Sequence, residues 1–516
     1  MDIKKAVGQR LMAGLPGTEI DPAFAALVRE CKVGNVILFS RNIKSAAQLT
    51  RLCASLRELI LTETGMEPFI AIDQEGGVVS RFSPDMAVTP GAMALAAIGG
   101  DAPYRAARIT AAQLRAAGVN FDLAPVLDVN SNPLNPVIGV RSFGDQPEAA
   151  AERAIGFMRG LLDGGVMACG KHFPGHGDTE TDSHIGLPCV GKSREELEKC
   201  ELLPFKRAIA AGIPAIMTSH VLFPAFEPEK VPATMSRRIL TGLLRQEMGF
   251  DGIIISDCME MDAVAKYYGT VNAATAALGA GADIVCISHT ASLARETAER
   301  LWKHYAEASS EEIRELERAG ERITKAKSRF TGLPKTEAQI FKLRAEARDM
   351  LEESFVLLNG PIPELGESPF FTGCAGIRAN LASSAINGMP PFAMVMARRF
   401  GGGFAVCSDD PDSEEIAAIV RKAKNASSIV LNTSSALRNS GQLILMLTLG
   451  KMKKPMVVIA MREPYELRYL PKHAAGIAAW EYSTRSIAAL AHCLSGKFKW
   501  TGRMPLGYFP IERINP

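Results

Sequence analysis

Short apolar runs alternate with amphipathic stretches through residues 1–310. The runs have the length of buried strands, and the stretches between them place apolar residues at helical spacing. We predict strands at Leu11–Leu15, Val36–Phe39, Phe69–Asp73, Phe121–Pro125, Val166–His172, Ala215–His220, Gly252–Asp257 and Asp283–Ser288. Helices are expected between them, for example at Ala46–Thr62, Ala102–Ala117, Glu148–Leu162, Arg194–Ala211 and Arg238–Met248. Eight β-then-α units favour a (β/α)8 TIM-type barrel, with a doubly wound sheet as the alternative.

Charged and histidine side chains stand where these predicted strands end. Asp73, His172, His220, Asp257 and His289 each lie at or just past the C-terminal end of a strand. In a barrel these ends converge on one mouth. Five of the eight histidines belong to the strand ends and their loops, namely His172, His176, His184, His220 and His289. This clustering predicts one active site at the mouth.

A second, smaller α/β unit is predicted after the barrel. A charged helix over Ser310–Arg329 and a linker over Thr331–Pro334 separate the two, so we divide the chain into domains 1–335 and 336–516, the second including a connecting helix. The Gly- and Pro-rich stretch 360–392 is expected to be loop. The expected elements are strands at Phe355–Leu358, Ala393–Met396, Ser428–Leu431 and Met456–Ala460, and helices at Ser413–Ala423 and Thr484–Ser495.

The composition argues against several classes of protein. Lys and Arg total 58 against 56 Asp and Glu, without basic runs, which gives no support for binding nucleic acid or an anionic membrane. The ten cysteines are scattered without a Cys-x-x-Cys pair, as in proteins of a reducing compartment. There is neither a signal-peptide pattern nor an apolar run of about 18 residues. We therefore expect a soluble cytoplasmic protein.

Asp257 is the first candidate for chemistry. It follows the apolar, β-branched run 252–256, so its carboxylate would point into the mouth, partly shielded from water. There it could attack an electrophilic carbon and form a covalent intermediate. The alternative is that Asp257 caps the following helix. Glu260 and Asp262 are competing acids nearby.

The loop 171–184 is the densest polar segment. It reads Lys-His-Phe-Pro-Gly-His-Gly-Asp-Thr-Glu-Thr-Asp-Ser-His, and Pro174 and Gly175 exclude a regular helix. Asp182 and His184 are two residues apart, close enough for the carboxylate to hold and polarise the imidazole. Such a dyad gives a histidine that titrates near neutrality and can act as a general acid and base.

A zinc site is the alternative use of these side chains. His172, His176, Asp182 and His184 could bind the metal in principle. However, His172 and His176 do not lie on a helix, so their spacing brings no shared face. We expect no metal and no other cofactor.

Further polar residues suit a sugar. Asp73 is followed by Gln-Glu-Gly-Gly, where the glycines allow close approach of the backbone to a ligand, and Arg81 lies on the same loop. The Asn-, Pro- and Gly-rich segment 128–144 would project Arg141 inward. Carboxylates and cations in a cleft match hydroxyl groups, which both donate and accept hydrogen bonds. The glycine tract 401–403 could cradle phosphate but is expected to be a turn.

Four blocks together resemble family 3 glycoside hydrolases, specifically the bacterial β-N-acetylglucosaminidase (β-hexosaminidase) branch. They occur in the family's order and cover the first domain. The blocks are Ile72–Gly77, Asp128–Gly144, Lys171–Gly177 with Asp182–His184, and Ile255–Asp257. Less sharply, Phe355–Asn359 and Thr501–Pro505 resemble the start and end of the family's second, αβα domain. The family fold is a TIM-type barrel followed by this domain.

The resemblance also implies roles for individual residues. Asp257 matches the nucleophile, and His184, paired with Asp182, matches the acid/base. The residues that hold the sugar in the −1 subsite correspond to Asp73, Arg81, Arg141, Lys171 and His172.

The chain departs from the family pattern at three places. These are Cys258 after the nucleophile, Val78 in the Gly-Gly block, and Asp262, where a smaller residue is usual. Neither Cys258 nor Val78 replaces a reacting group, so we expect changed fine specificity and retained activity.

The implied function is a retaining exo-β-N-acetylglucosaminidase that releases terminal N-acetylglucosamine from peptidoglycan fragments through a covalent glycosyl-enzyme. Its expected partner is a small-molecule carbohydrate, and the protein is expected to be a monomer or homodimer. Chito-oligosaccharides are an alternative substrate, and substrate assistance by the acetamido group an alternative mechanism. A phosphorylase and a non-catalytic sugar-binding protein are the alternative functions.

Overall fold

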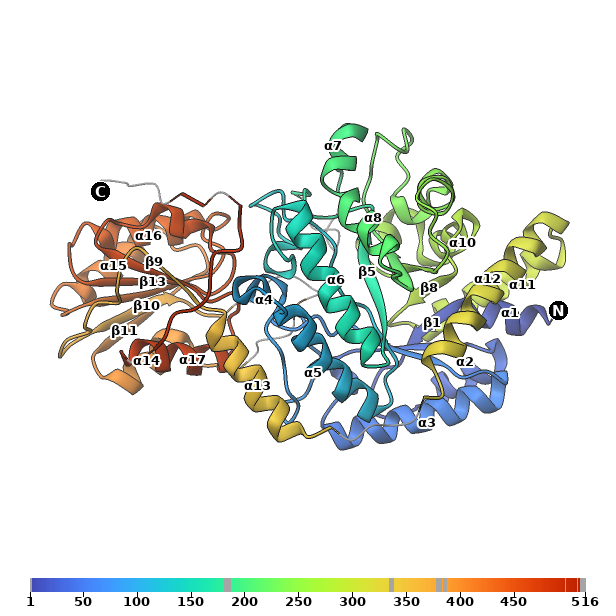
Figure 1. Cartoon of the computed structure of the whole chain (residues 1–516), viewed down its shortest axis with the longest axis horizontal. Helices are drawn as coiled ribbons and strands as arrows, with labels where there is room; N and C mark the ends of the chain where they lie inside the picture. Colours follow the sequence, from blue (N-terminus) through green and yellow to red (C-terminus); the bar gives the residue numbers. More distant parts are fainter. Residues whose placement is uncertain are drawn as a thin grey trace.

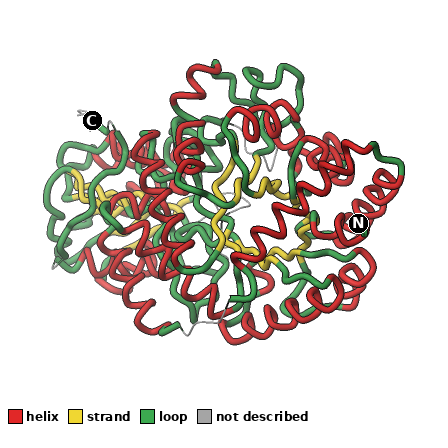
Figure 2. The backbone as a smooth tube through the Cα atoms, turned by 45° about the vertical axis from the view of Figure 1, so that its right-hand side comes forward, coloured by secondary structure: helices red, strands yellow, loops and turns green. Residues whose placement is uncertain are grey.

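A closed barrel of parallel strands forms the first part of the protein. The computed structural model describes residues 2–180, 187–333, 338–376, 383, 388–496, 498–507 and 509–510. Within these, eight strands pair in sequence order and β8 pairs back to β1, so the predicted TIM-type barrel is confirmed and a doubly wound sheet is excluded. Figure 2 shows the strands enclosed by helices. The strands are β1 (Leu11–Gly14), β2 (Asn35–Leu38), β3 (Phe69–Ile72), β4 (Phe121–Asp122), β5 (Met167–Phe173), β6 (Ala215–Thr218), β7 (Ile253–Cys258) and β8 (Ile284–Ile287).

Helices connect these strands. They are α1 (Ile3–Gln9), α2 (Pro22–Cys31), α3 (Ala46–Thr64), α4 (Ala92–Ile98), α5 (Ala102–Ala117), α6 (Pro147–Asp163), α7 (Arg194–Lys199), α8 (Leu202–Ala210), α9 (Asp262–Tyr268), α10 (Thr270–Ala280), α11 (Ala291–Ala306) and α12 (Ser310–Phe330). A π-helix, η4 (Arg238–Glu247), and short 3-10 turns, η1 (Ser40–Asn42), η2 (Gly139–Arg141) and η3 (Ala233–Met235), complete this part. The single helix predicted at Arg194–Ala211 is instead two. Pro204 cannot donate to the carbonyl of Cys200, so the chain breaks between α7 and α8.

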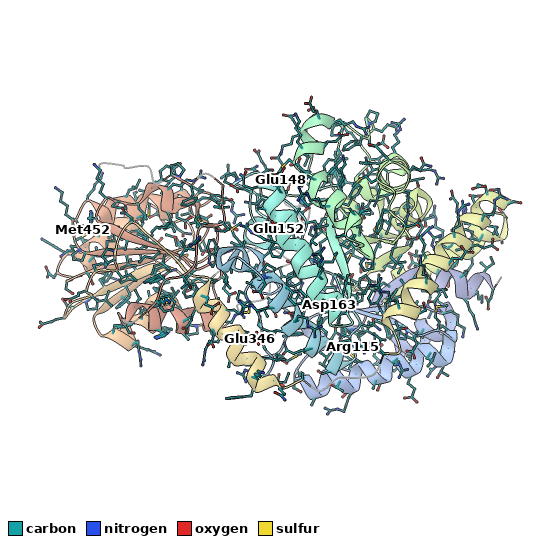
Figure 3. The ribbon with its side chains drawn as sticks, in the orientation of Figure 1. Arg115, Glu148, Glu152, Asp163, Glu346 and Met452 are labelled. Atoms are coloured by element: carbon teal, nitrogen blue, oxygen red, sulfur yellow. The ribbon has the colours of Figure 1, made fainter. Side chains whose placement is uncertain are left out.

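The helix α6 shows why these segments pack against the barrel. Its acids Glu148, Glu152 and Asp163, labelled in Figure 3, are exposed to solvent. Residues of the same helix at helical spacing, including Phe157 and Leu161, are buried in the core between helices and strands. A stripe of apolar residues on one face is what fixes a helix against a sheet.

The amino end of the barrel is closed by α12. Ile323 and Phe330 of this helix pack against the inward-facing residues of the strands. Between them, Lys327 is buried and its Nζ donates to Gln9 Oε1 at 2.6 Å and to the carbonyl oxygen of Gly34 at 2.9 Å. Burial lowers the pKa of Lys327 to about 7.

This buried lysine predicts a pH-dependent stability. An unfolded lysine has a pKa of about 10.4, so above pH 7 the unfolded chain binds more protons than the folded one. The unfolding free energy should therefore rise by about 1.4 kcal/mol per pH unit from this residue, until the effect ends near pH 10. Urea denaturation across this range should show the slope in the wild type and a smaller slope in Lys327→Met. Equal slopes would contradict a depressed pKa.

The second part is a six-stranded sheet in the order β11-β10-β12-β13-β14-β9, parallel except for β9. Figure 1 places it at the end of the molecule away from the N-terminus, with α13 running between the two parts. Its strands are β9 (Val356–Leu358), β10 (Phe370–Cys374), β11 (Gly403–Cys407), β12 (Ile429–Thr433), β13 (Met456–Ala460) and β14 (Ala474–Ala478). Its helices are α13 (Ile340–Glu353), α14 (Phe392–Phe400), α15 (Ser413–Ala423), α16 (Ser440–Gly450) and α17 (Thr484–Leu494), with a 3-10 turn η5 (Tyr465–Tyr469).

Several predictions for this part are wrong. The predicted strand Ala393–Met396 lies in α14, because a short apolar run does not distinguish a buried helix from a strand. The predicted loop 360–392 contains β10, and β11 and β14 were not anticipated. The domain boundary at 335/336 falls in residues 334–337, outside the described residues, and stays a prediction. No helix within the described ranges is long and apolar enough to cross a membrane.

Candidate active site

A cavity of about 470 Å³ opens at the carboxyl ends of the barrel strands. Its floor is apolar and consists of Ile37, Leu123 and Met217 from the barrel interior. Its wall carries most of the charged side chains predicted from the sequence, and Ser383 of the second part also lines it. The ionisable side chains of this wall include Asp73, Glu75, Arg81, Arg141, Lys171, His172, His176, Asp257, Cys258, Glu260, Asp262 and His289.

Irregular strand pairing brings the polar residues into this cavity. The register between β5 and β6 shifts between Gly170 and Phe173, and that between β7 and β8 shifts between Ile255 and Cys258. In a regular strand successive side chains point to opposite faces, and a bulge changes that direction. As a result Lys171 and His172, which are consecutive, both line the cavity, as do Asp257 and Cys258.

A buried ion cluster forms one wall. Arg141 donates to both carboxylate oxygens of Glu75, from Nε at 2.9 Å and from Nη2 at 2.7 Å. Lys171 Nζ lies 2.7 Å from Glu75 Oε1 and 2.8 Å from Asp73 Oδ1. Arg81 Nη2 lies 3.8 Å from Asp73 Oδ2. Three cations and two carboxylates thus form a continuous network.

The neighbouring charges hold Glu75 and Lys171 in the charged state. Burial alone would raise the pKa of Glu75, but the charges of Arg141 and Lys171 outweigh it and lower the pKa well below its ordinary value. Burial would lower the pKa of Lys171, yet Asp73 and Glu75 raise it. The wall therefore carries fixed donors and acceptors at neutral pH, as recognition of sugar hydroxyls requires.

Removing Lys171 should destabilise the protein strongly. Lys171→Met removes the cation that joins the two carboxylates. Glu75 keeps Arg141, but among the described cations Asp73 keeps only Arg81 at 3.8 Å, and breaking a buried ion pair of this kind costs roughly 3–5 kcal/mol. Chemical denaturation would measure this loss. A matched control is Lys199→Met, because Lys199 pairs with Glu195 on the surface, with both side chains more than 70% exposed. Equal stability of the two variants would contradict the role of the cluster.

Asp128 fixes the start of the loop after β5. Its Oδ1 accepts from the backbone N of His176 at 2.7 Å, and its Oδ2 lies 2.7 Å from His172 Nδ1. Burial alone would raise the pKa of Asp128, but the charge of His172 and its hydrogen bond outweigh this effect and lower the pKa, so Asp128 is a carboxylate that accepts from His172. This contact orients the imidazole of His172 at the cavity.

His176 is neutral at physiological pH. Burial, and then the charge of His172, lower its pKa to about 4. Its Nδ1 lies 2.8 Å from Thr179 Oγ1. We infer that His176 shapes the loop and does not transfer protons near neutrality.

The structure therefore brings Asp73, Arg81, Arg141, Lys171, His172 and Asp257 to one cavity. Their roles stay predictions. The predicted acid/base pair, Asp182 and His184, lies in residues 181–186, outside the described residues. His289 lines the cavity, whereas His220 lies beside it, with Nε2 3.0 Å from the carbonyl oxygen of Cys258.

Two important residues were missed as candidates. Glu75 stands in the Gln-Glu-Gly-Gly motif, and Asp128 opens the loop that carries Arg141. Each is an acid just beyond a predicted strand, the same signal that selected Asp73. Their partners, however, are 44 to 96 positions away in sequence, and no local pattern indicates which acid pairs with which cation.

Residues 4–326 match the family described as "Glycosyl hydrolase family 3 N terminal domain". The match covers more than half of the chain, including every strand of the barrel. The chain belongs to glycosyl hydrolase family 3. It is accordingly a glycoside hydrolase, as the sequence blocks predicted.

Similar proteins agree with this assignment. A β-hexosaminidase of Thiobacillus denitrificans is 37% identical over 56% of this chain and 81% of its own length. For β-hexosaminidase A of Pseudoalteromonas piscicida the match, also 37% identical, covers 52% of this chain but only about half (48%) of that relative. Among solved structures, a family 3 β-N-acetylglucosaminidase from Paenibacillus sp. is 34% identical with a TM-score of 0.87, over 99% of this chain and all of its own.

Proposed function

We propose that this family 3 enzyme is a retaining exo-β-N-acetylglucosaminidase. The observation that carries the proposal is the cavity itself, which Asp257 lines together with the Asp73–Lys171–Glu75–Arg141 cluster. The apolar floor of barrel residues bounds the cavity on its inner side, which favours entry of the terminal unit of a sugar chain. The names of the similar proteins support N-acetylglucosaminides as the substrate class.

The proposed mechanism is a double displacement. Asp257 attacks the anomeric carbon and forms a glycosyl ester while His184 protonates the departing glycosidic oxygen. The same histidine, now neutral, takes a proton from water, and the resulting attack on the anomeric carbon releases the sugar and regenerates Asp257. Retention of configuration follows because two inversions occur at one carbon.

A histidine changes the electrostatics of the second step. After giving up its proton it is neutral, whereas the carboxylic acid of most retaining enzymes becomes an anion. Asp182 would compensate by stabilising the imidazolium. A neutral base also tolerates an anionic acceptor, so phosphate in place of water would make the enzyme a phosphorylase that yields N-acetylglucosamine 1-phosphate.

The proposed natural substrate is a peptidoglycan fragment in which N-acetylglucosamine is linked to N-acetylmuramic acid or its anhydro form. This choice rests on the family resemblance and on the cytoplasmic location expected from the composition. Chito-oligosaccharides have the same terminal sugar and would occupy the same cavity.

Nitrophenol release from aryl β-glycosides of N-acetylglucosamine and of glucose, with and without phosphate, tests the proposal. Turnover of the acetamido sugar at a rate independent of phosphate is the expected result. A rate that rises with phosphate would identify a phosphorylase. Preference for glucose would contradict the assignment of the acid/base loop, and no turnover of either would favour a sugar-binding protein.

A further inference from the structure

The loop that carries Arg141 is attached to the second part of the protein. Asn130, near the start of this loop, donates through Nδ2 to the hydroxyl of Tyr465 at 2.7 Å. Its Oδ1 accepts from the backbone N of Gly139 at 3.0 Å. Gly139 begins the 3-10 turn η2 that ends in Arg141. One buried amide thus links Tyr465 to the turn that presents Arg141 to the cavity.

Glu463 forms a second attachment to the same turn. A Cβ placed on Gly139 would lie only 2.4 Å from Glu463 Oε1, so the turn sits directly on this carboxylate. Glu463 is itself fixed, since Ser435 Oγ donates to its Oε2 at 2.5 Å and Arg462 Nη2 lies 3.2 Å from its Oε1. The turn can approach the carboxylate this closely because glycine at position 139 has no Cβ.

The loop that carries Glu75, the partner of Arg141, is held from the same side. Arg485 of α17 donates to the carbonyl oxygens of Val88 and, at 3.0 Å, Thr89, and Thr89 in turn accepts from Gly77 N at 2.9 Å. Trp480 lines a void of about 10 Å³ directly behind Glu75 and Arg141. The ion cluster that contains Glu75 and Arg141 therefore lies against the second part.

The two parts also share a hydrophobic core at this place. Met93 and Ala97 of α4, together with Val140 of the Arg141 turn, pack in the same buried cluster as the strands of the second sheet. Figure 1 shows α4 at the junction between the barrel and that sheet. A rigid, buried junction can transmit position to Arg141, whereas a hinged one could not.

We propose that Tyr465 and Glu463 are positioning residues, which act from the second domain to hold Arg141 in place for the sugar. The inference rests on the proposed function, in which Arg141 binds the terminal N-acetylglucosamine. It gives the second domain a part in substrate binding, while both proposed reacting groups, Asp257 and His184, belong to the first domain.

Tyr465→Phe is the direct test, because it removes only the hydroxyl that accepts from Asn130. If Arg141 contacts the sugar equally in the ground state and the transition state, a misplaced Arg141 raises KM and leaves kcat nearly unchanged. We expect KM for an aryl N-acetylglucosaminide, and the inhibition constant of N-acetylglucosamine, to rise about three- to tenfold, and kcat to stay within about twofold. Glu463→Asp should give the same pattern, because it keeps the charge but withdraws the carboxylate from Gly139, and it serves as the second variant should Tyr465→Phe fold poorly.

Ser428→Ala is the matched control. It also removes one buried hydroxyl from the second domain, but its partner, the carbonyl oxygen of Leu365, belongs to the same domain. Its KM should equal that of the wild type. An equal rise in KM for Ser428→Ala would show general loosening of the domain and overturn the inference.

A double-mutant cycle asks whether Tyr465 acts through Arg141. In an Arg141→Lys background, Tyr465→Phe should change KM by less than about twofold, because the side chain it positions is already altered. If the effects of the two substitutions on KM were fully additive, the inference would be overturned and the proposed function would stand. The same holds if the KM of Tyr465→Phe equalled that of the wild type. A wild-type enzyme that neither binds N-acetylglucosamine nor turns over its glycosides would overturn both.

Discussion

Replacing Asp257 by alanine is expected to lower kcat/KM by about 10⁴-fold or more, because it removes the group that forms and then releases the covalent intermediate. The fold should be unaffected, since the side chain is only half-buried at the end of β7. Steady-state hydrolysis of an aryl N-acetylglucosaminide measures the loss, and thermal denaturation confirms that the variant is folded.

Azide distinguishes a missing nucleophile from a damaged site. A small anion can occupy the space left by the carboxylate and attack the anomeric carbon once, which gives an α-glycosyl azide and partial recovery of rate. Asp262→Ala is the matched control, because Asp262 lines the same cavity and its truncation also leaves room for azide. It should lose far less activity and gain nothing from azide. Azide rescue of the Asp262 variant instead would transfer the nucleophile role to that residue.

Replacing His184 by alanine is expected to give a loss that depends on the leaving group. Proton donation by a side chain contributes about 10²–10⁴-fold when the departing oxygen is basic, and little when it leaves readily as an anion. Disaccharides should therefore lose the full factor, whereas dinitrophenyl glycosides should lose less than about tenfold in the glycosylation step. A series of aryl glycosides of graded acidity measures this dependence.

His289→Ala is the control for that series, because it removes another imidazole from the same cavity. Any loss it causes should be uniform across leaving groups. A uniform loss in His184→Ala as well would show that His184 is not the proton donor, and a graded loss in His289→Ala would move the role to His289.

The barrel could be predicted because its determinants are local. Each strand is a short apolar run, and each run is followed by a polar residue that the fold must bring to the same mouth. Asp73, His172 and Asp257 were found by this rule alone. The same rule could not predict which charged residues pair. Glu75 contacts Arg141 and Lys171, 66 and 96 positions away in sequence, only because the barrel closes.

The second domain was predicted less well for a related reason. Four of its parallel strands, β10, β12, β13 and β14, are buried along their whole length and lack the alternation that identifies a half-exposed strand. The run Ala-Met-Val-Met at 393–396 is therefore compatible with a buried strand or a buried helix, and in the structure it is helical. The contact between Gly139 and Glu463 joins two loops more than 300 positions apart, and only the folded chain shows that Arg141 depends on the second domain.

Trapping the intermediate tests the central claim most directly. A fluorinated N-acetylglucosamine with a good leaving group should glycosylate the nucleophile and turn over slowly, so that digestion and mass spectrometry locate the sugar on one peptide. We predict a mass increase on the peptide that contains Asp257, localised to that residue. An unmodified Asp257 peptide under conditions of complete inactivation, or modification of Glu260 or Asp262, would contradict the mechanism.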